Sequence, residues 1–252
     1  MAKASGYQKR FYRELREHKG LTYFTVMCKE TDLLIAAERH LGKEAEEAVL
    51  KYRNQIEEYI ETTPLFKDSL IPLSSDPFAP KIVKEMLTAA EKAGVGPMAS
   101  VAGAIAEYVG RDLLAYSGEI IVENGGDLFL KVLRDIVVEI ISGDSPLSGK
   151  LALKIKSENT PLGICTSSGT VGHSLSFGSA DAVTIVSASA SLADAVATST
   201  GNMIKKKEDI SRGLQYAQSI EGVRGAVIMK EHSLGVWGDV EIEAVNSHYR
   251  TA

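Results

Sequence analysis

Apolar residues recur at regular intervals along the chain, and their spacing predicts the elements of its N-terminal part. Residues 21–27 (LTYFTVM) have the composition of a β-strand. From Lys43 to Glu61 apolar side chains repeat at helical spacing, which predicts a long amphipathic helix. Prolines punctuate residues 63–80 and oppose regular structure, so we expect a long ordered loop there. A second helix is predicted from Lys81 to Ala93, ended by Gly94.

A third helix is predicted to begin at Pro97, a residue suited to the first helical position, and to continue to about Tyr116. Small residues repeat along one side of it. Glycine inside a soluble helix usually has a packing reason, so a neighbouring helix or sheet is expected to approach closely. The residues that form this stripe are Ala99, Gly103, Ala106 and Gly110.

Strands and helices follow without the regular alternation of a parallel α/β fold. Segments 119–123, 127–132 and 135–141 predict an antiparallel meander with a hairpin turn at Asn124-Gly125. We therefore expect an α+β fold with mainly antiparallel sheets packed with helices. The remaining predicted elements are strands at 151–155, 182–187, 225–229 and 235–245 and helices at 192–204 and 208–220.

Composition and net charge argue against several classes of protein. A chain of 252 residues, 44% hydrophobic and 24% charged, can form a single domain over residues 1–252, with residues 1–20 as a solvated basic leader. The net charge of −5 opposes a nucleic-acid partner. The start lacks a signal-like apolar run, and no long apolar stretch occurs, which predicts a cytoplasmic protein without a membrane partner. Two cysteines in unpaired contexts support neither a disulfide framework nor a thiolate zinc site.

The segment 161–178 (PLGICTSSGTVGHSLSFG) concentrates glycines and hydroxyl residues after a short apolar run. Such a loop can surround an anion, because glycines let backbone amides approach and hydroxyls add donors, but a plain structural loop fits equally well. Cys165 is a candidate nucleophile beside these donors and His173 a candidate base, whereas a buried, inert cysteine is the more usual outcome. The candidate anion-binding residues are Thr166, Ser167, Ser168, Gly169 and Thr170.

Two further groups of residues could carry chemistry. Asp194 and Thr198 are four residues apart and share a helical face, so they could bind a hard cation such as Mg²⁺ or Ca²⁺. Their spacing alone favours another role, because Ser191 and Asp194 fit a helix-capping pattern. In the second group, Glu123 and Asp127 flank a tight turn and could bind a ligand or act as acid and base, although turn chemistry alone accounts for Asn124, Gly125 and Gly126.

Read together, these segments resemble the flavin-handling ApbE superfamily. ENGGDLFL, ICTSSG and SLADAVATSTGN occur in the order and spacing of its motifs, and residues 103–109 are similar to its GIAKGYA helix. The resemblance, over residues 94–202, implies a cation site formed by the Ala106 carbonyl, Asp194 and Thr198. It also implies a flavin or nucleotide pocket lined by Asp127, a catalytic candidate, and by the two loops. The loop residues are Glu123, Asn124, Gly125, Gly126 and Thr166 to Thr170.

Two departures argue against standard flavin transfer. Glu107 stands where the superfamily has lysine, which reverses the charge expected beside a diphosphate. The H-x-I-x-D-P-x-T-G segment of flavin transferases is also missing after His173. Longer strings, among them KETDLLI and CTSSGTVGHSLSFG, resemble an uncharacterised prokaryotic family within the superfamily. That resemblance implies an association with sulfide assimilation toward homocysteine.

These observations lead to one main hypothesis and two alternatives. The main hypothesis is a divalent-cation-assisted transferase or hydrolase that acts on a small, phosphorylated, flavin- or nucleotide-like ligand. The first alternative is a non-catalytic or sulfur-relay accessory protein that uses Cys165. The second is a flavin-binding module without turnover. A homodimer is a further expectation, because edge strands of antiparallel sheets often pair between subunits.

Overall fold

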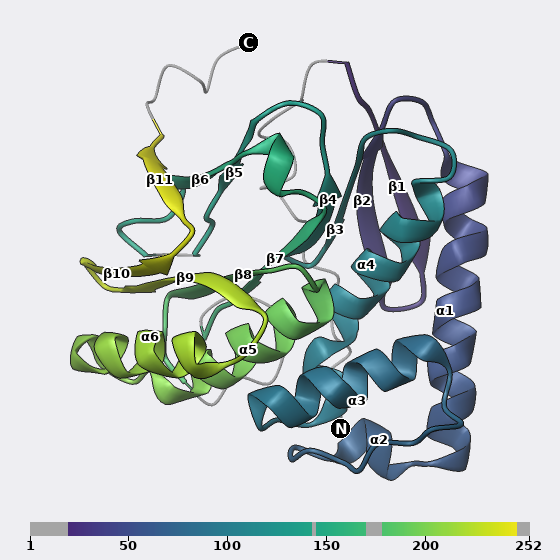
Figure 1. Ribbon diagram of the computed structural model, residues 1–252, viewed down its shortest axis with the longest axis horizontal. Coiled ribbons are helices and arrows are strands. Elements are labelled where there is room, and N and C mark those ends of the chain that lie inside the picture. Colours follow the sequence, from purple (N-terminus) through teal and green to yellow (C-terminus); the bar gives the residue numbers. More distant parts are fainter. Residues whose placement is uncertain (1–19, 143–144, 170–177, 246–252) are drawn as a thin grey trace, which may run out of the picture.

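The larger of two β-sheets carries the helices on one of its faces (Figure 1). The structure, a computed structural model, describes residues 20–142, 145–169 and 178–245. Over these residues the larger sheet has eight strands in the order β1-β2-β3-β4-β7-β8-β9-β10, and the smaller sheet has three in the order β11-β6-β5. Every neighbouring pair among these strands is antiparallel.

The elements have the following bounds. The strands of the larger sheet are β1 (Thr22–Cys28), β2 (Thr31–Ala37), β3 (Ile120–Asn124), β4 (Asp127–Lys131), β7 (Leu162–Ser167), β8 (Ala182–Ser187), β9 (Val223–Lys230) and β10 (Ser233–Gly238). The smaller sheet consists of β5 (Ile136–Glu139), β6 (Leu151–Ile155) and β11 (Glu241–Ala244). The helices are α1 (Gly42–Thr62), α2 (Leu65–Asp68), α3 (Lys81–Ala93), α4 (Val101–Leu113), α5 (Ala190–Met203) and α6 (Ile210–Ser219). Short 3₁₀ turns are η2 (Pro97–Ser100), η3 (Ser157–Asn159) and η4 (Lys207–Asp209).

The central strands of the larger sheet are buried on both faces, between the helices on one side and the smaller sheet on the other. Successive side chains of a strand point to opposite faces, so Phe129 of β4 packs among the helices while Leu130 packs toward the smaller sheet. Ile164 of β7 joins Leu130, and Cys165 lies on the helix side. Polar side chains on the helix face of β4 and β7 therefore lie between the larger sheet and the helices. Among the described residues, no helix has the length and apolar character needed to cross a bilayer.

The α+β class with mainly antiparallel sheets is confirmed, and most predicted elements form. Gly94 ends α3 in the left-handed conformation at φ +65°, as expected for a helix-ending glycine. The three-stranded meander is wrong in its last strand, because β4 lies between β3 and β7 and β5 pairs with β6 in the other sheet. The strand predicted at 235–245 is also two strands, β10 and β11, in different sheets.

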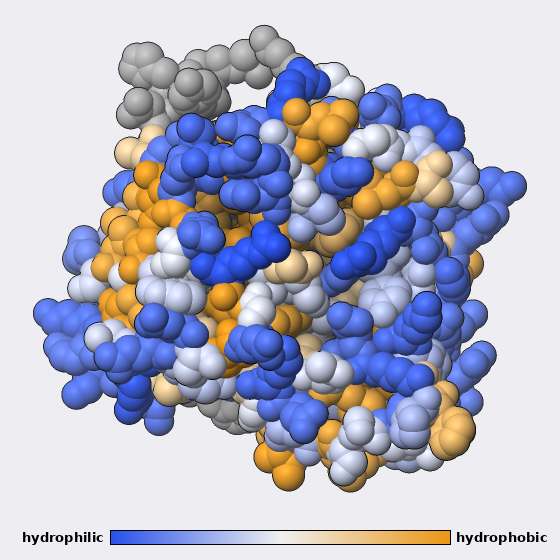
Figure 2. All heavy atoms as spheres, in the orientation of Figure 1, coloured by the Kyte–Doolittle hydropathy of each residue, from blue (hydrophilic) through white to orange (hydrophobic). Residues whose placement is uncertain are grey.

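The proline-rich segment 63–80 is mostly irregular but contains the short helix α2, which Phe66 anchors in the core. A methyl group on Gly96 would overlap the Ser69 carbonyl, so the segment lies directly against the start of η2. Apolar side chains gather on the surface over this segment, along the lower edge of the view in Figure 2. These exposed residues are Leu65, Leu70, Ile71 and Phe78.

Candidate functional site

The β3–β4 hairpin brings two polar side chains to the helix face of the sheet. Gly125 and Gly126 have φ of +70° and +105°, a conformation that favours glycine at both central positions of a tight turn. The Asn124 amide donates to the Ala102 carbonyl at the start of α4, at 3.1 Å. Strand alternation then places Asp127 on the same face as Asn124 and Glu123 on the opposite face. Glu123 accepts the Gly126 amide at 2.7 Å and so closes the turn.

Asp127 lies beside Cys165 of the neighbouring strand β7, with only 8% of its surface exposed. Burial raises the pKa of Asp127 well above its usual range, and the nearby charge of Asp194 raises it further. The Cys165 thiol and the Thr166 amide of β7 act in the opposite direction and lower this pKa in part. The structure thus brings together two residues that the sequence placed in separate motifs.

Cys165 itself is fully buried, and its thiol lies 3.3 Å from the Ala190 carbonyl. Burial raises the pKa of the Cys165 thiol, and the carboxylates of Asp127 and Asp194 add to this effect. The expectation of a reactive thiolate at Cys165 stays a prediction, and burial and the two nearby carboxylates oppose the thiolate form. His173, the proposed base, lies outside the described residues.

Asp194 extends from α5 to the first turn of α4. Its Oδ2 accepts the Gly103 amide at 2.9 Å, and the Ala102 amide also donates to this carboxyl group. Burial nevertheless raises the pKa of Asp194 to about 7. The two helices approach this closely because a methyl group on Gly103 would overlap the Ala190 carbonyl. The close contact predicted from the small-residue stripe is confirmed here.

The cap predicted at Ser191 and Asp194 is wrong. Ser189 is the N-cap of α5 and accepts the Leu192 amide at 3.3 Å, while the buried Ser191 hydroxyl has no hydrogen-bond partner among the described residues. Asp194 instead accepts a hydrogen bond from a backbone amide at the start of α4. A capping pattern is a local signal, and here a neighbouring helix supplies the competing donors.

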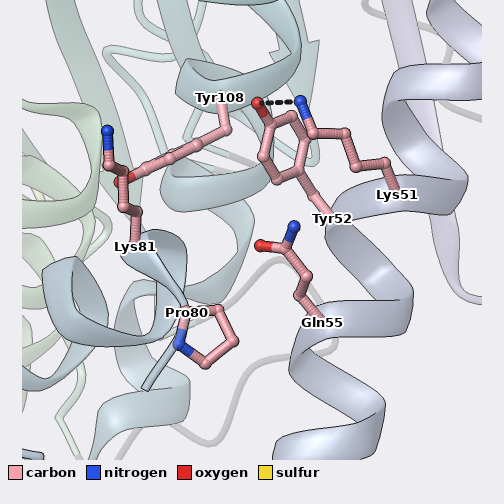
Figure 3. A pocket seen from close by; sticks show the side chains of 6 residues that line it. All are labelled: Lys51, Tyr52, Gln55, Pro80, Lys81 and Tyr108. Atoms are coloured by element: carbon pink, nitrogen blue, oxygen red, sulfur yellow. Dashed lines mark hydrogen bonds between the residues drawn. The ribbon is translucent and has the colours of Figure 1, made fainter. Parts of the chain in front are cut away.

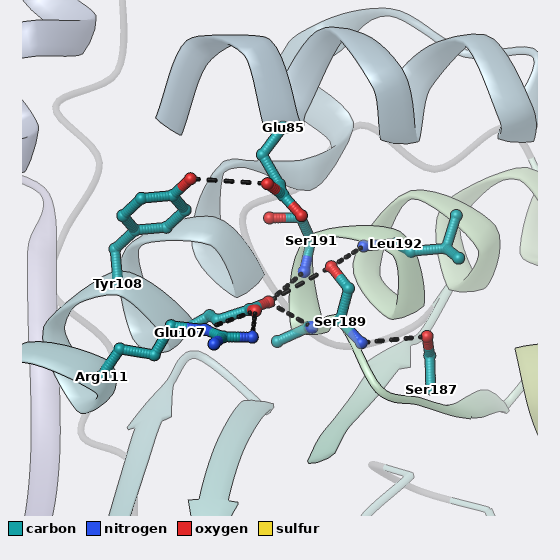
Figure 4. A network of polar contacts seen from close by, with 9 residues as sticks. Glu85, Glu107, Tyr108, Arg111, Ser187, Ser189, Ser191 and Leu192 are labelled. Atoms are coloured by element: carbon teal, nitrogen blue, oxygen red, sulfur yellow. Dashed lines mark hydrogen bonds and ion pairs between the residues drawn. The ribbon is translucent and has the colours of Figure 1, made fainter. Parts of the chain in front are cut away.

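Glu107 of α4 performs the matching role for α5, as Figure 4 shows. One of its carboxylate oxygens accepts the Ala190 amide at 2.7 Å and the Ser189 hydroxyl at 3.2 Å. The other accepts two bonds from Arg111, at 2.7 and 2.9 Å. Both oxygens of this 2%-exposed side chain are thus engaged inside the protein. The interpretation of Glu107 as a charge facing a diphosphate is not supported, because it neutralises a helix start and an arginine.

The first two residues of the TSSG segment belong to a strand rather than to a loop. Thr166 and Ser167 are the last residues of β7, and alternation sends them to opposite faces. The Thr166 hydroxyl lies 2.9 Å from the Thr184 hydroxyl, on the side of the smaller sheet. Ser167 faces α5, where a methyl group on Gly201 would lie 3.3 Å from its hydroxyl.

The rest of that segment continues past the strand end. The Gly169 amide donates to the Ala180 carbonyl at 2.9 Å, and Ser168 lies between Gly169 and the strand. Thr170 lies outside the described residues, as His173 does. Ser167 is therefore the hydroxyl residue of this segment that the strand aims toward the helices.

A cation site would draw on Asp127, Asp194 and Thr198. Thr198 is one turn after Asp194 on the same helix, is partly buried, and has no hydrogen-bond partner within the described residues. Ala106 is fully buried on α4, and the participation of its carbonyl stays a prediction. In the described part of the chain, no three His, Cys, Asp or Glu side chains form a metal-ligand group. Such a site would therefore combine two carboxylates with neutral oxygen donors, a set that suits a hard cation.

The chain has relatives among known proteins. A family model described as "AbpE bacteria" matches residues 13–222. The UPF0280 protein MJ1526 of Methanocaldococcus jannaschii is 39% identical over 221 residues, which cover 85% of this chain and 90% of the relative. A UPF0280 protein of Methanococcus aeolicus is 43% identical over 201 residues, 78% of this chain and 81% of the relative.

Solved structures with the same fold are much more distant in sequence. The flavin transferase ApbE from Vibrio cholerae has a TM-score of 0.52 at 16% identity and covers 86% of this chain and 96% of its own. The apo flavinyl transferase ApbE of Pseudomonas stutzeri has a TM-score of 0.57 at 13% identity, with 86% and 94% covered. At such identity the likeness establishes the fold alone. The family model and the archaeal relatives show that the chain belongs to the AbpE bacteria family and is related to the UPF0280 proteins, and the solved structures show that it has the fold of the ApbE flavin transferases.

Proposed function

We propose that this protein is a divalent-cation-assisted transferase or hydrolase that acts on a small, phosphorylated, flavin- or nucleotide-like ligand. The observation that carries the proposal is that the partly buried Asp194 lies near the buried Asp127 and raises the pKa of its carboxyl group. Burying two carboxylates together is costly unless a cation or protons compensate them. A divalent cation would remove that cost and would fit their oxygen donors.

Different residues of the chain would bind the cation and admit the ligand. Asp127, Asp194 and the Thr198 hydroxyl would hold the cation, with the Ala106 carbonyl as a further ligand implied by the superfamily resemblance. When bound, the cation would orient phosphate oxygens and stabilise the negative charge that develops on them. Gly125 and Gly126 carry no side chain that would keep a ligand from the turn backbone beside Asp127.

Standard flavin transfer to a protein threonine is not part of the proposal. The H-x-I-x-D-P-x-T-G segment of flavin transferases is missing from the sequence. Glu107 no longer contributes to this argument, because it caps α5 inside the protein. The sulfur-relay alternative loses support, since the Cys165 thiol is buried beside acids that oppose a thiolate. Cytoplasmic location and a homodimer remain predictions for localisation and sedimentation measurements.

The test is to incubate purified protein with FAD, ADP-ribose or ATP, in Mg²⁺ or in EDTA, and to separate the products by liquid chromatography. We expect cleavage or transfer at a phosphate of at least one ligand, dependent on Mg²⁺. Asp127→Asn and Asp194→Asn are expected to lose it. A bound flavin that stays intact in every condition would instead favour the flavin-binding module.

A further inference from the structure

A hollow lies between α1, the start of α3 and α4, and Figure 3 shows it from close by. Its volume is about 300 Å³, at the lower end of the range of small-molecule pockets. None of its lining residues belongs to the Asp127–Asp194 pair. They are Lys51, Tyr52, Gln55, Pro80, Lys81 and Tyr108.

The hollow has two ammonium groups at its rim. Lys51 is held in place by Asp112, 2.9 Å away, and by the Tyr52 hydroxyl at 3.1 Å. Lys81 has no ion pair or hydrogen bond within the described residues, and no acidic residue lies in the first turn of its helix. Part of the charge of Lys51 is compensated by Asp112, whereas that of Lys81 is available to a ligand.

The walls are aromatic and apolar. The rings of Tyr52 and Tyr108 meet edge to face with their centroids 5.0 Å apart, and Pro80 closes the opposite side. The Gln55 amide points toward the same space in Figure 3 and has no partner among the described residues. Flat apolar walls beneath two cations and an amide suit an amphipathic ligand.

We propose that this hollow binds a small organic anion, with a carboxylate or phosphate group on a flat apolar body. The flat body would lie against Tyr108 and the anionic group would meet Lys81, because the Lys51 ammonium is already held by Asp112 and over the Tyr52 ring. This site is separate from the carboxylate pair and needs no divalent cation.

The experiment is isothermal titration of the full chain with phenyl phosphate, benzoate, inorganic phosphate and neutral benzyl alcohol. We expect saturable one-to-one binding of phenyl phosphate or benzoate, in EDTA as in Mg²⁺, and much weaker binding of benzyl alcohol and inorganic phosphate. The comparison of phenyl phosphate with benzoate identifies the anionic group that the hollow prefers.

Substitutions locate the binding. Lys81→Gln is expected to weaken it about tenfold, the loss that follows from removing one charge-assisted hydrogen bond. Lys84→Gln on the same helix, outside the hollow, and Asp194→Asn at the carboxylate pair are expected to change it less than about twofold. Lys81 is exposed, so its substitution leaves the fold intact. Equal binding by wild type and Lys81→Gln, equal binding of benzyl alcohol, absence of saturable binding, or loss in Asp194→Asn would each overturn the proposal.

Discussion

Glu107 and Asp194 each cap the helix that carries the other. Glu107 of α4 accepts the Ala190 amide of α5 at 2.7 Å, and Asp194 of α5 accepts the Gly103 amide of α4 at 2.9 Å. The first turn of a helix has unpaired backbone amides and a partial positive charge. Each carboxylate accepts hydrogen bonds from these amides and compensates this charge on the neighbouring helix. This reciprocal capping pair locks the two helices together next to Asp127.

Replacing Glu107 tests the structural role of this lock. Glu107→Ala removes the acceptor for three donors of α5 and leaves Arg111 without its partner, so we expect a loss of about 2–4 kcal/mol in the free energy of unfolding. Glu91→Gln, at an exposed glutamate of α3, is the control and should change it by less than about 0.5 kcal/mol. Denaturant melts measure both. Equal effects would show that Glu107 contributes little to stability.

The raised pKa of Asp194 predicts how stability depends on pH without a cation. A carboxyl group whose folded pKa is about 7, above its unfolded value, gives stability that is present at low pH. That stability is lost as the pH rises from about 4 through about 7, with a slope of up to about 1.4 kcal/mol per pH unit. Melts in EDTA at several pH values measure it. Asp194→Asn should flatten the dependence over this range, and an unchanged profile would contradict the assignment.

Divalent cations are expected to stabilise the fold above neutral pH. A ligand that binds only the folded state adds RT ln(1 + [L]/Kd), or about 2.7 kcal/mol at a hundredfold excess over Kd. Thermal melts with Mg²⁺ or Ca²⁺ should therefore shift upward. Asp127→Asn and Asp194→Asn should remove most of the shift, and Thr198→Val should reduce it. Indifference of the wild-type melt to both cations would exclude the proposed site.

Cys165 is expected to react more slowly with iodoacetamide than Cys28 in the native protein at neutral pH. Cys165 is fully buried and the pKa of its thiol is raised, whereas Cys28 is partly exposed. Mass spectrometry of peptides after brief labelling measures both rates, and labelling in denaturant shows that both thiols are intact. Faster labelling of Cys165 would revive the sulfur-relay hypothesis.

No FMN is expected to be transferred from FAD to a threonine-containing acceptor peptide, because the sequence lacks the H-x-I-x-D-P-x-T-G segment. A flavin transferase ApbE with the same peptide serves as the positive control. In-gel fluorescence or mass spectrometry detects the covalent flavin. A flavinylated acceptor produced by this protein would show that the segment is dispensable.

Local patterns predicted much of the fold and less of the site. The helices α1 and α3 and the β3–β4 hairpin follow from periodicity and from glycine at special positions, signals contained within each segment. The departure of β5 to the second sheet depends on β7 taking the place beside β4, which no local pattern reveals. Segment 31–37 was not predicted as a strand, because its nearly continuous burial leaves no alternation of apolar and polar residues.

In the candidate site too, local patterns predicted some features, and others depend on tertiary contacts. The motifs of Asp127 and Asp194 were found from the sequence, but the effect of Asp194 on Asp127 and the effect of both carboxylates on Cys165 depend on tertiary contacts. The Ser191 cap failed because α4 offers Asp194 better placed donors. Glu107 and Arg111 carried a signal in their four-residue spacing, which indicates an ion pair but not the helix start that Glu107 also serves.

Close backbone contacts hold the start of α5 in addition to the Glu107 side chain. Methyl groups on Gly103 or on Gly163 would both overlap the backbone of Ala190, from α4 and from β7 respectively. Asp194, one turn further along, therefore cannot move sideways relative to Asp127 without displacing a strand or a helix. A rigid pair of donors discriminates between ions by radius, since Mg²⁺ requires oxygen distances of about 2.0–2.1 Å and Ca²⁺ about 2.3–2.6 Å. In a protein that binds a cation here, Gly103 and Gly163 would set the ionic size that it accepts.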